Sequence, residues 1–549
     1  MATRTPATAG GSRRIDGWGF VGETYPASPS LLRWLRDRLG EAQPFPAFDP
    51  AAWSAPEPAP LPDLPGEIDR DPLGRFAVSR GQGLPDLLRL RSGTVPRLPD
   101  AVARPADAAE LRALLSAAGR HGLVLVPRGG GTSVTGGVNV PHRGAPAVTV
   151  DLARLSGLEE LDETSGLATF GAGTTGPGIE AALGERGFTL GHFPQSWELS
   201  TLGGWIATRS AGQESLGYGR IEALVAGLEV AAPAGDLVIP ALPASAAGPD
   251  LRQLVLGSEG RLGVVTRATV RVRPRPEETR LEAALVPGWE GGAAAARELV
   301  QAGVPLTLLR LSDAAETEVA MAVGLGAGFL GRLVRGWLRL RRVGEGSCLL
   351  LLGAAGSPEA VDASLETARA LLRPQVAVWL GARPGRRWLA DRFRHPYLRD
   401  GLLDCGYATD TFETAAPWSR LEGLYGAVRR AFRDAAGKGE REVPLLCHLS
   451  HPYRDGASLY FTFFFRCPGD PDAAVARWAD LKRRATEAVA SAGGTLSHHH
   501  GVGSWHAPWY PREAGELGCR ALGRLARELD PNRILNPHVL LDPADRLED

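Results

Sequence analysis

Lysine is nearly missing from this chain of 549 residues, which has only Lys438 and Lys482 among its 61 basic side chains. A mechanism built on a catalytic lysine therefore has almost no candidates. Cysteine is also scarce, and the five cysteines are scattered without CxxC spacing. The sequence thus offers neither a zinc framework nor a disulfide framework, as expected for a protein of a reducing cytoplasm.

Excess charge, long apolar runs and targeting signals are lacking as well. The net charge is -1 and the isoelectric point is near 6.9, so the charge balance gives no reason to expect a nucleic-acid partner. No uncharged apolar run reaches the roughly 18 residues that a membrane span needs. The N-terminus lacks the regions of a signal peptide, and the last residues, RLED, are not a peroxisomal address. We therefore expect a soluble, cytoplasmic protein.

The first half of the chain divides into two parts. Residues 1–94 combine a capped helical pattern at 28–41 with a Pro- and Ala-rich stretch at 40–75, which predicts an extended arm. Residues 95–276 alternate strand and helix patterns and end in a run of β-branched residues.

The second half of the chain predicts a different architecture. Residues 277–500 alternate apolar strands with long amphipathic helices, which indicates an antiparallel sheet covered by helices. Residues 501–549 contain one further helix and form a C-terminal segment that we expect to return to the 95–276 region. Together the patterns predict an α+β protein.

Residues 127–137, PRGGGTSVTGG, contain the most informative loop. Three consecutive glycines, Gly129–Gly131, cost backbone entropy and are followed by the hydroxyls of Thr132 and Ser133. Bare backbone amides form a nest for an anion, and hydroxyls add donors, so the loop favours a pyrophosphate site. A tight turn is the alternative, but a turn needs only one or two glycines.

Two other phosphate-binding motifs fit less well. A Walker A loop requires a GK pair followed by Ser or Thr, and the pair Gly437-Lys438 is followed by Gly439. A GxGxxG pattern occurs at 171–176, but Pro177 follows at once and no acidic residue lies at the expected distance. We interpret that pattern as punctuation between a strand and a helix.

Three segments in this order resemble the flavin-binding domain of the vanillyl-alcohol oxidase family, which is of the PCMH type. They are residues 98–137, residues 191–212 (GHFPQSWELSTLGGWIATRSAG) and residues 257–274 (GSEGRLGVVTRATVRVRP). The resemblance implies a two-subdomain FAD-binding domain at 95–276, with 277–500 as a cap domain. Many members carry a flavin-linked histidine near the first loop, where this chain has Thr132 and Ser133, so non-covalent FAD is expected.

The resemblance also assigns cofactor-binding residues. The pyrophosphate is wrapped by Pro127, Arg128, Gly129, Gly130, Gly131, Thr132 and Ser133. The flavin is lined by Gln195, Ser196, Trp197, Glu198, Leu199, Ser200 and Thr201, and by Thr208, Arg209, Ser210 and Ala211. The adenine side is closed by Glu259, Gly260, Arg261, Leu262, Gly263, Val264 and Val265.

Three consecutive histidines occur in SHHHGVGSW, residues 497–505. A metal-binding tract, an expression tag or a solvated loop are the alternatives, but a tag inside the chain is implausible and metal ligands usually have other spacings. Histidines followed by Gly501 and Gly503 suit a bent loop that presents several imidazoles to one anionic, proton-exchanging substrate. We expect no metal.

Further stretches accompany the histidines, and they resemble the alkyldihydroxyacetonephosphate synthase family of ether-lipid synthesis. They are RRIDGWGF (13–20), LLRLSD, YLRDGLL, TDTFETAAPW (409–418) and HPYRDGASLYFTF. The resemblance implies that an acyl chain of acyl-dihydroxyacetone phosphate is exchanged for a fatty alcohol. It implies catalytic roles for Tyr460, His498, His499 and His500, and substrate binding by Arg399 and Arg310.

Other interpretations stay open. On its own, Tyr460 in an alternating strand is more typical of packing, and the SWHAPWYP segment departs from the more basic pattern of the relatives. One alternative function is an FAD-dependent 2-hydroxy-acid dehydrogenase or oxidase, and another is a non-catalytic flavoprotein at a membrane. Residues 323–342 have arginines on one helical face and apolar residues on the other, which fits either contact with an anionic membrane surface or docking on the protein. A homodimer is also left open.

Overall fold

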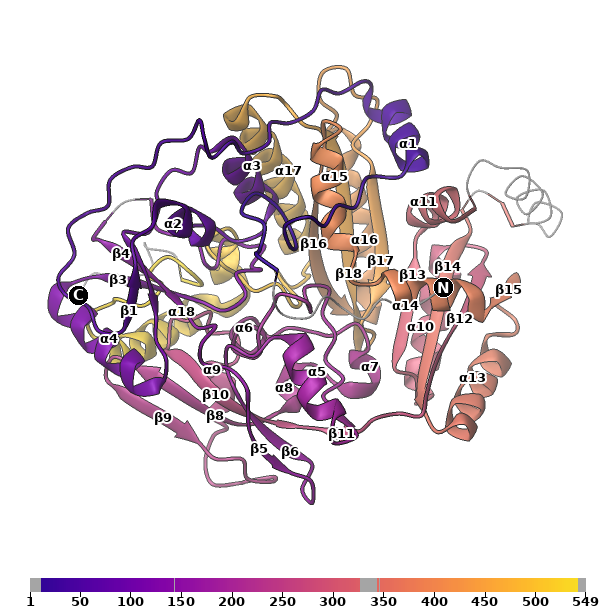
Figure 1. Cartoon of the computed structure of the whole chain (residues 1–549). Helices are drawn as coiled ribbons and strands as arrows, with labels where there is room; N and C mark the ends of the chain where they lie inside the picture. Colours follow the sequence, from indigo (N-terminus) through magenta and orange to yellow (C-terminus); the bar gives the residue numbers. More distant parts are fainter. Residues whose placement is uncertain (1–10, 143, 326–342, 345, 542–549) are drawn as a thin grey trace.

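The computed structural model describes residues 11–142, 144–325, 343–344 and 346–541. Most of the helix predicted at 323–342 lies outside these residues. Two purple and magenta sheets built from the first half of the chain lie beside a larger orange sheet from the second half (Figure 1). No described helix has both the length and the apolar character that crossing a bilayer requires.

The first sheet has four strands in the order β1-β2-β4-β3. Its strands are β1 (Glu67–Asp69), β2 (Ala101–Arg104), β3 (Val124–Arg128) and β4 (Ala147–Asp151). The pairs β2–β4 and β3–β4 are parallel, and β1 joins the edge antiparallel. The predicted helix at 106–122 is α4 (Ala108–His121), which Asp107 caps and Gly122 ends in the left-handed conformation. The N-terminal arm is thus joined to this sheet through β1.

The second sheet is fully antiparallel, with the order β5-β6-β10-β8-β9. Its strands are β5 (Leu158–Asp162), β6 (Leu167–Gly171), β8 (Val225–Ala232), β9 (Gly235–Ile239) and β10 (Val264–Arg271). The GxGxxG pattern lies between β6 and α5 (Gly176–Gly184). A Cβ at Gly173 would lie 2.1 Å from the Leu152 carbonyl oxygen, so packing of the chain's own backbone accounts for that glycine.

The third sheet has seven antiparallel strands, as predicted for 277–500, in the order β15-β12-β14-β13-β17-β18-β16. Its strands are β12 (Glu278–Val286), β13 (Leu308–Ser312), β14 (Cys348–Gly356), β15 (Val378–Gly381), β16 (Tyr407–Pro417), β17 (Leu445–Ser450) and β18 (Gly456–Arg466). One face packs on α10 (Trp289–Gln301), α13 (Pro358–Leu372), α16 (Trp418–Arg433) and α17 (Pro471–Ser491).

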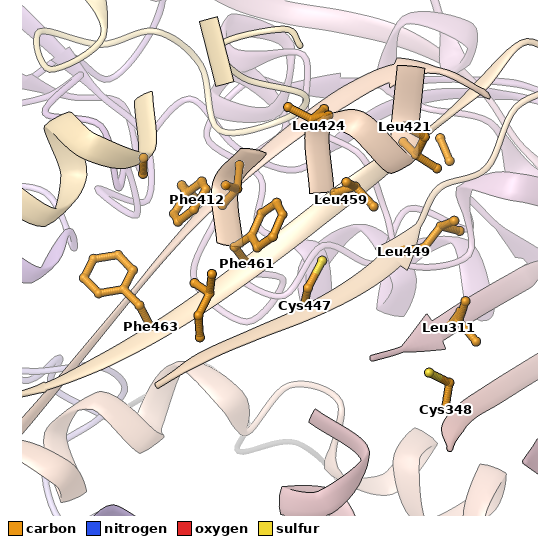
Figure 2. Close-up of a cluster of buried hydrophobic side chains, with 14 of the residues drawn as sticks. Leu311, Cys348, Phe412, Leu421, Leu424, Cys447, Leu449, Leu459, Phe461 and Phe463 are labelled. Atoms are coloured by element: carbon orange, nitrogen blue, oxygen red, sulfur yellow. The ribbon is translucent and has the colours of Figure 1, made fainter. Parts of the chain in front are cut away.

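Alternation along β18 decides which side chains reach the core. Phe461 and Phe463 pack with Phe412, Leu449 and Leu459 against the helices (Figure 2). Tyr460 alternates with these residues and therefore points to the opposite face of the sheet. That opposite face is where the cavity described below lies.

The N-terminal arm and the C-terminal segment both run to the first sheet. From α1 (Pro29–Leu39) beside the orange sheet, residues 40–66 run without helix or strand along the top of the molecule in Figure 1. They reach α2 (Pro72–Val78) and α3 (Leu84–Ser92), so the stretch predicted at 40–75 is free of helix and strand as far as residue 66 and then forms β1 and the start of α2. After α18 (Tyr510–Leu529), Leu535 bridges Leu125 of β3, which brings the C-terminal segment back to the first sheet.

The remaining described elements are short or peripheral. They are β7 (Phe188–Thr189), α6 (Leu202–Thr208), α7 (Ser215–Tyr218), α8 (Ile221–Leu224), α9 (Arg252–Val255), β11 (Arg273–Pro274), α11 (Ala314–Leu325), α14 (Ala382–Asp391), η1 (His395–Tyr397), α15 (Leu398–Leu403) and η2 (Ala507–Trp509). All five cysteines are free thiols.

Candidate active site

A cavity of about 330 Å³ lies between the glycine loop and the seven-stranded sheet. It brings together most residues that the sequence singled out, although they come from all parts of the chain. The predicted cofactor residues that line it are Pro127, Gly129, Gly130, Gly131, Thr132, Ser133, Gln195, Ser196, Ser200, Thr201, Thr208, Ser210, Ala211, Glu259, Gly260, Gly263, Val264 and Val265. The predicted catalytic and substrate residues that line it are Arg310, Arg399, Tyr460, His499 and His500.

Eight predicted site residues lie behind the cavity wall instead: Arg128, Trp197, Glu198, Leu199, Arg209, Arg261, Leu262 and His498. Several of them hold the wall in place. The Trp197 ring stacks on Phe393, and Glu198 accepts a hydrogen bond from the Tyr397 hydroxyl. Arg261 donates to the Leu535 carbonyl, which fastens the C-terminal segment. Contact of these eight residues with a cofactor stays a prediction.

Close packing against neighbouring protein atoms accounts for the three glycines of the loop. A Cβ at Gly130 would lie 1.9 Å from the Leu199 carbonyl oxygen, and one at Gly129 would lie 2.2 Å from Thr201 Oγ1. Gly131 has a φ of +66°, and the Arg128 guanidinium would lie 2.2 Å from its Cβ. The neighbouring 199–201 loop thus excludes a side chain at Gly129 and Gly130, and Arg128 excludes one at Gly131; residues of both loops line the cavity.

The loop region suits an anionic cofactor. Arg128 is 7% exposed, and its Nε has no hydrogen-bond partner among the described residues. Asp151, the partner of Arg128 in the β3–β4 register, is the acidic group that acts on this guanidinium. A buried cation beside bare glycine amides fits the pyrophosphate of FAD. Non-covalent attachment of FAD stays a prediction.

Tyr460 lies at the cap end of the cavity. Its hydroxyl donates to Thr411 Oγ1 at 3.1 Å and is 3.4 Å from Gln195 Oε1, which joins the sheet to the predicted flavin-lining segment. Its ring stacks on His448, with centroids 4.9 Å apart. Burial raises the pKa of Tyr460 to about 12, so the hydroxyl is protonated at neutral pH.

The three histidines lie side by side, but they are not equivalent. His498 is hydrogen-bonded through Nε2 to the Tyr453 hydroxyl and through Nδ1 to His499, behind the wall. His499 and His500 face the cavity. Burial lowers the pKa of His499 to about 3 and that of His500 to about 4, although the Glu413 carboxylate opposes the shift. Both imidazoles are therefore neutral and able to accept a proton at neutral pH.

A buried carboxylate that sequence reasoning missed fixes this loop. Glu413 of β16 accepts hydrogen bonds from the backbone amides of His498, His499 and His500 and from the Ser497 hydroxyl. Burial alone would raise the pKa of Glu413, but the neighbouring imidazoles and amides outweigh it and hold this pKa well below its ordinary value. The only available signal was its place in TDTFETAAPW.

Glu259 fastens the next part of the loop from the other side. Its carboxylate accepts the backbone amides of Val502 at 2.6 Å and Gly503 at 2.7 Å. Burial raises the pKa of Glu259 to about 7, and the two amides oppose that shift. The residue predicted to close the adenine side therefore also positions the histidine loop.

The two arginines have different surroundings. Arg310 lies 2.8 Å from the Glu316 carboxylate and 3.0 Å from His448 Nδ1, so its charge is already paired. Arg399 at the start of α15 donates to the Gln82 carbonyl and has no acidic partner among the described ion pairs. Arg399 is thus the better placed of the two to bind a substrate anion. The composition gave no hint of Glu316 or of buried His448.

Two histidine groups have the spacing of metal ligands. The donor atoms of His451, His498 and His499 lie within 4.8 Å of one another, and so do those of Glu413, His499 and His500. Both oxygens of Glu413 are engaged by the loop amides. The carboxylate is thus accounted for by its backbone contacts.

Comparisons with known proteins agree with this arrangement. Residues 99–239 match the family described as FAD binding domain, and residues 275–540 match FAD linked oxidases, C-terminal domain. FAD is therefore the cofactor. The structure is similar to p-cresol methylhydroxylase at a TM-score of 0.66 and 13% identity, covering 86% of this chain and 94% of the other, which shows the fold alone.

Two further relatives are more similar. Alkyldihydroxyacetonephosphate synthase of Trypanosoma brucei brucei is 33% identical over 488 residues, which are 86% of this chain and 78% of the relative. A solved structure of an alkyldihydroxyacetonephosphate synthase has a TM-score of 0.81 at 27% identity and covers 96% of this chain and 98% of the other. The chain belongs to the alkyldihydroxyacetonephosphate synthase family of FAD-dependent enzymes.

Proposed function

We propose that this enzyme exchanges the acyl chain of acyl-dihydroxyacetone phosphate for a fatty alcohol and so forms an ether bond. The observation that carries the proposal is the single cavity that joins the glycine loop to Tyr460, His499, His500 and Arg399. Acyl ester and alcohol become alkyl ether and free fatty acid, so no electrons are gained or lost overall. FAD, when bound, supplies the electron-accepting ring next to which this exchange takes place.

Arg399 is proposed to bind the substrate phosphate. Its guanidinium lines the cavity and can form paired hydrogen bonds with phosphate oxygens. Arg310 is proposed to act mainly by fixing Glu316 and His448, because its charge is already paired. His448 in turn supports the Tyr460 ring.

The neutral imidazoles are proposed to move the first proton. The substrate ketone makes the neighbouring C–H acidic, and His499 or His500 can take that proton because both imidazoles line the cavity and are unprotonated at neutral pH. The electron pair of the broken C–H bond is held by FAD, when bound, while the acyl group leaves as a carboxylate and the alcohol oxygen bonds to the same carbon. The imidazole then returns the proton to that carbon, so that the C–H bond is restored. Tyr460 is proposed to orient the alcohol and relay its proton, since its own hydroxyl is protonated at neutral pH.

Anaerobic turnover of the purified yellow protein tests this proposal. It is mixed with palmitoyl-dihydroxyacetone phosphate and then with hexadecanol, while the oxidised-flavin absorption is recorded and products are identified by mass spectrometry. We expect alkyl product and recovery of the oxidised spectrum without oxygen. If instead a 2-hydroxy acid bleaches the flavin until an acceptor is added, the enzyme is a dehydrogenase. Retained FAD without either reaction would indicate a non-catalytic flavoprotein.

The finer properties predicted from the sequence stay proposals. We propose a domain division at 94/95, 276/277 and 500/501, in which the cap carries Tyr460 and the FAD-binding domain carries the glycine loop. We also propose that the enzyme works in the cytoplasm and touches the membrane surface through 323–342, because both substrates carry lipid chains. Co-sedimentation with anionic liposomes should fall when Arg332, Arg335, Arg339 and Arg342 are changed to Glu, and no difference would end the membrane proposal. Light scattering of the purified protein measures its molecular mass and so tests whether it forms a homodimer.

A further inference from the structure

The N-terminal segment folds into a small hairpin that reaches the cofactor loop. Arg13 bridges Phe20, the Arg14 amide donates to the Gly19 carbonyl, and the Val21 amide donates to the Ser12 carbonyl. These contacts close residues 11–21, which we name the N-terminal hairpin. The helical and Pro-rich patterns of the arm assign it no role in binding, and RRIDGWGF (13–20) is part of the family resemblance without a role for Arg13.

One face of the hairpin is fitted against the cap. The Trp18 amide donates to Asp400 Oδ2 at 2.8 Å, and Arg14 lies 3.5 Å from the same carboxylate oxygen. Gly19, with a φ of +87°, allows contact with Tyr397, because a Cβ there would lie 2.3 Å from that ring. Asp400 adjoins Arg399, so the hairpin is anchored beside the proposed phosphate ligand.

The other face touches the glycine loop. Arg13 Nη1 donates to the Gly130 carbonyl oxygen at 2.5 Å from outside the cavity. In a trans peptide the carbonyl and the following N–H point in opposite directions. Fixing the Gly130 carbonyl on Arg13 therefore turns the Gly131 N–H away from Arg13, and both Gly130 and Gly131 line the cavity. The Trp18 ring, which is 2% exposed, forms part of the same wall.

The charges behind the loop favour an anion in front of it. Arg13 and Arg128 act on each other, with Asp151 as the carboxylate that attracts both. Burial first, and then the charge of Arg128, lower the pKa of Arg13 to about 9, while Asp151 opposes the shift. Arg13 stays protonated at neutral pH. The repulsion between a half-buried and a buried cation that share one carboxylate is relieved when a diphosphate binds nearby.

We propose that Arg13 is a positioning residue for the cofactor: it holds the Gly130 peptide in the anion-binding orientation and adds a second cation behind the pyrophosphate loop. The N-terminal hairpin is then part of the FAD site and links it to α15. This inference rests on FAD as the cofactor and not on the ether-forming activity.

The test measures FAD binding to the apoprotein of wild type, Arg13→Ala, Arg13→Lys and Arg36→Ala by flavin fluorescence. Arg36 lies on α1 of the same arm, pairs with Glu41 and is outside the cavity lining, so its loss changes the net charge equally. Loss of a charge-assisted contact should weaken FAD binding about 10- to 100-fold in Arg13→Ala. Arg13→Lys should recover part of the affinity, and Arg36→Ala should bind as wild type does.

A phosphate-free ligand separates positioning from a general loss of structure. Riboflavin affinity should change by less than about threefold in Arg13→Ala, and the salt dependence of FAD binding should become shallower, because the lost term is electrostatic. Thermal melting of the apoproteins checks that each variant folds. Equal FAD affinity in Arg13→Ala and Arg36→Ala would overturn the inference. Equal weakening of FAD and riboflavin would overturn it too, since that result indicates a structural role only.

Discussion

Replacement of Glu413 by Gln should release the histidine loop while leaving the histidines in the chain. Four donors converge on this carboxylate, among them the amides of His499 at 3.1 Å and His500 at 2.9 Å. Gln keeps one acceptor oxygen but loses the charge, and its NH2 group faces the His498 amide. Each hydrogen bond to a charged group contributes about 1.5–3 kcal/mol, and a buried amide without a partner costs about 1–3 kcal/mol.

The loss therefore amounts to about 3–5 kcal/mol in the local stability of the loop. At about 1.4 kcal/mol per tenfold change, amide hydrogen exchange at residues 498–503 should accelerate about 100- to 1,000-fold or more. Ether formation should fall steeply, whereas FAD retention should persist because the glycine loop is untouched. Glu422→Gln, on the exposed side of α16, is the matched control.

Two results would refute the reasoning. Exchange rates at 498–503 that match those of the control would mean that the carboxylate does not hold the loop. If amide exchange at 498–503 stays unchanged while ether formation is lost, Glu413 acts in the chemical step itself and does not act by holding the loop. Glu413 should also continue to hold the histidine loop in mild acid. The pKa of Glu413 is lowered in the folded protein, so its contribution to stability is lost only when the pH falls through that folded pKa, which lies well below the ordinary value of 4.5.

Tyr460→Phe should lower kcat for ether formation by about 10²- to 10⁴-fold while FAD stays bound, measured by product formation and flavin absorbance; an active variant would exclude the proton relay. Lowered pKa values keep the loop imidazoles unprotonated as pH falls, so the acid limb of kcat/KM should lie below about pH 6.5; a limb at or above that pH would contradict this. Gly130→Ala should destabilise the fold by about 1–3 kcal/mol through its contact with the Leu199 carbonyl, whereas Gly184→Ala in open space should not; equal melting temperatures would disprove the packing argument.

The elements with strong periodicity could be predicted from the sequence, and the reasons are local. α4 has an Asp cap, helical apolar spacing and a terminal glycine, and each signal lies within the helix itself. The antiparallel cap sheet was also predictable, because apolar strands alternate with long amphipathic helices along 277–500. Period-two alternation even places Tyr460 on the face opposite Phe461 and Phe463.

The contacts between distant segments could not be predicted in the same way. The glycine run indicated a close neighbour, but only the fold shows that this neighbour is the Leu199 carbonyl. Glu413 is one of 62 acidic residues, and its function comes from a loop some 85 positions away. Arg13 was one arginine of a motif, and only the folded arm places it at Gly130. In each case the residue's function comes from a contact with a residue far away in the sequence and not from a local sequence pattern.

The histidine loop is held at two points by side-chain carboxyl groups from different parts of the chain. Glu413 of the seven-stranded sheet holds the amides of residues 498–500, and Glu259, just before β10, holds those of 502 and 503. The backbone of the histidines is thus fixed by two carboxyl groups, in addition to side-chain contacts such as those of His498 with Tyr453 and His499. Changing His499 or His500 should alter proton transfer without moving the loop, whereas changing either carboxylate should move every imidazole at once. The loop thus fixes the distance between cap and cofactor region, which an exchange on one carbon requires.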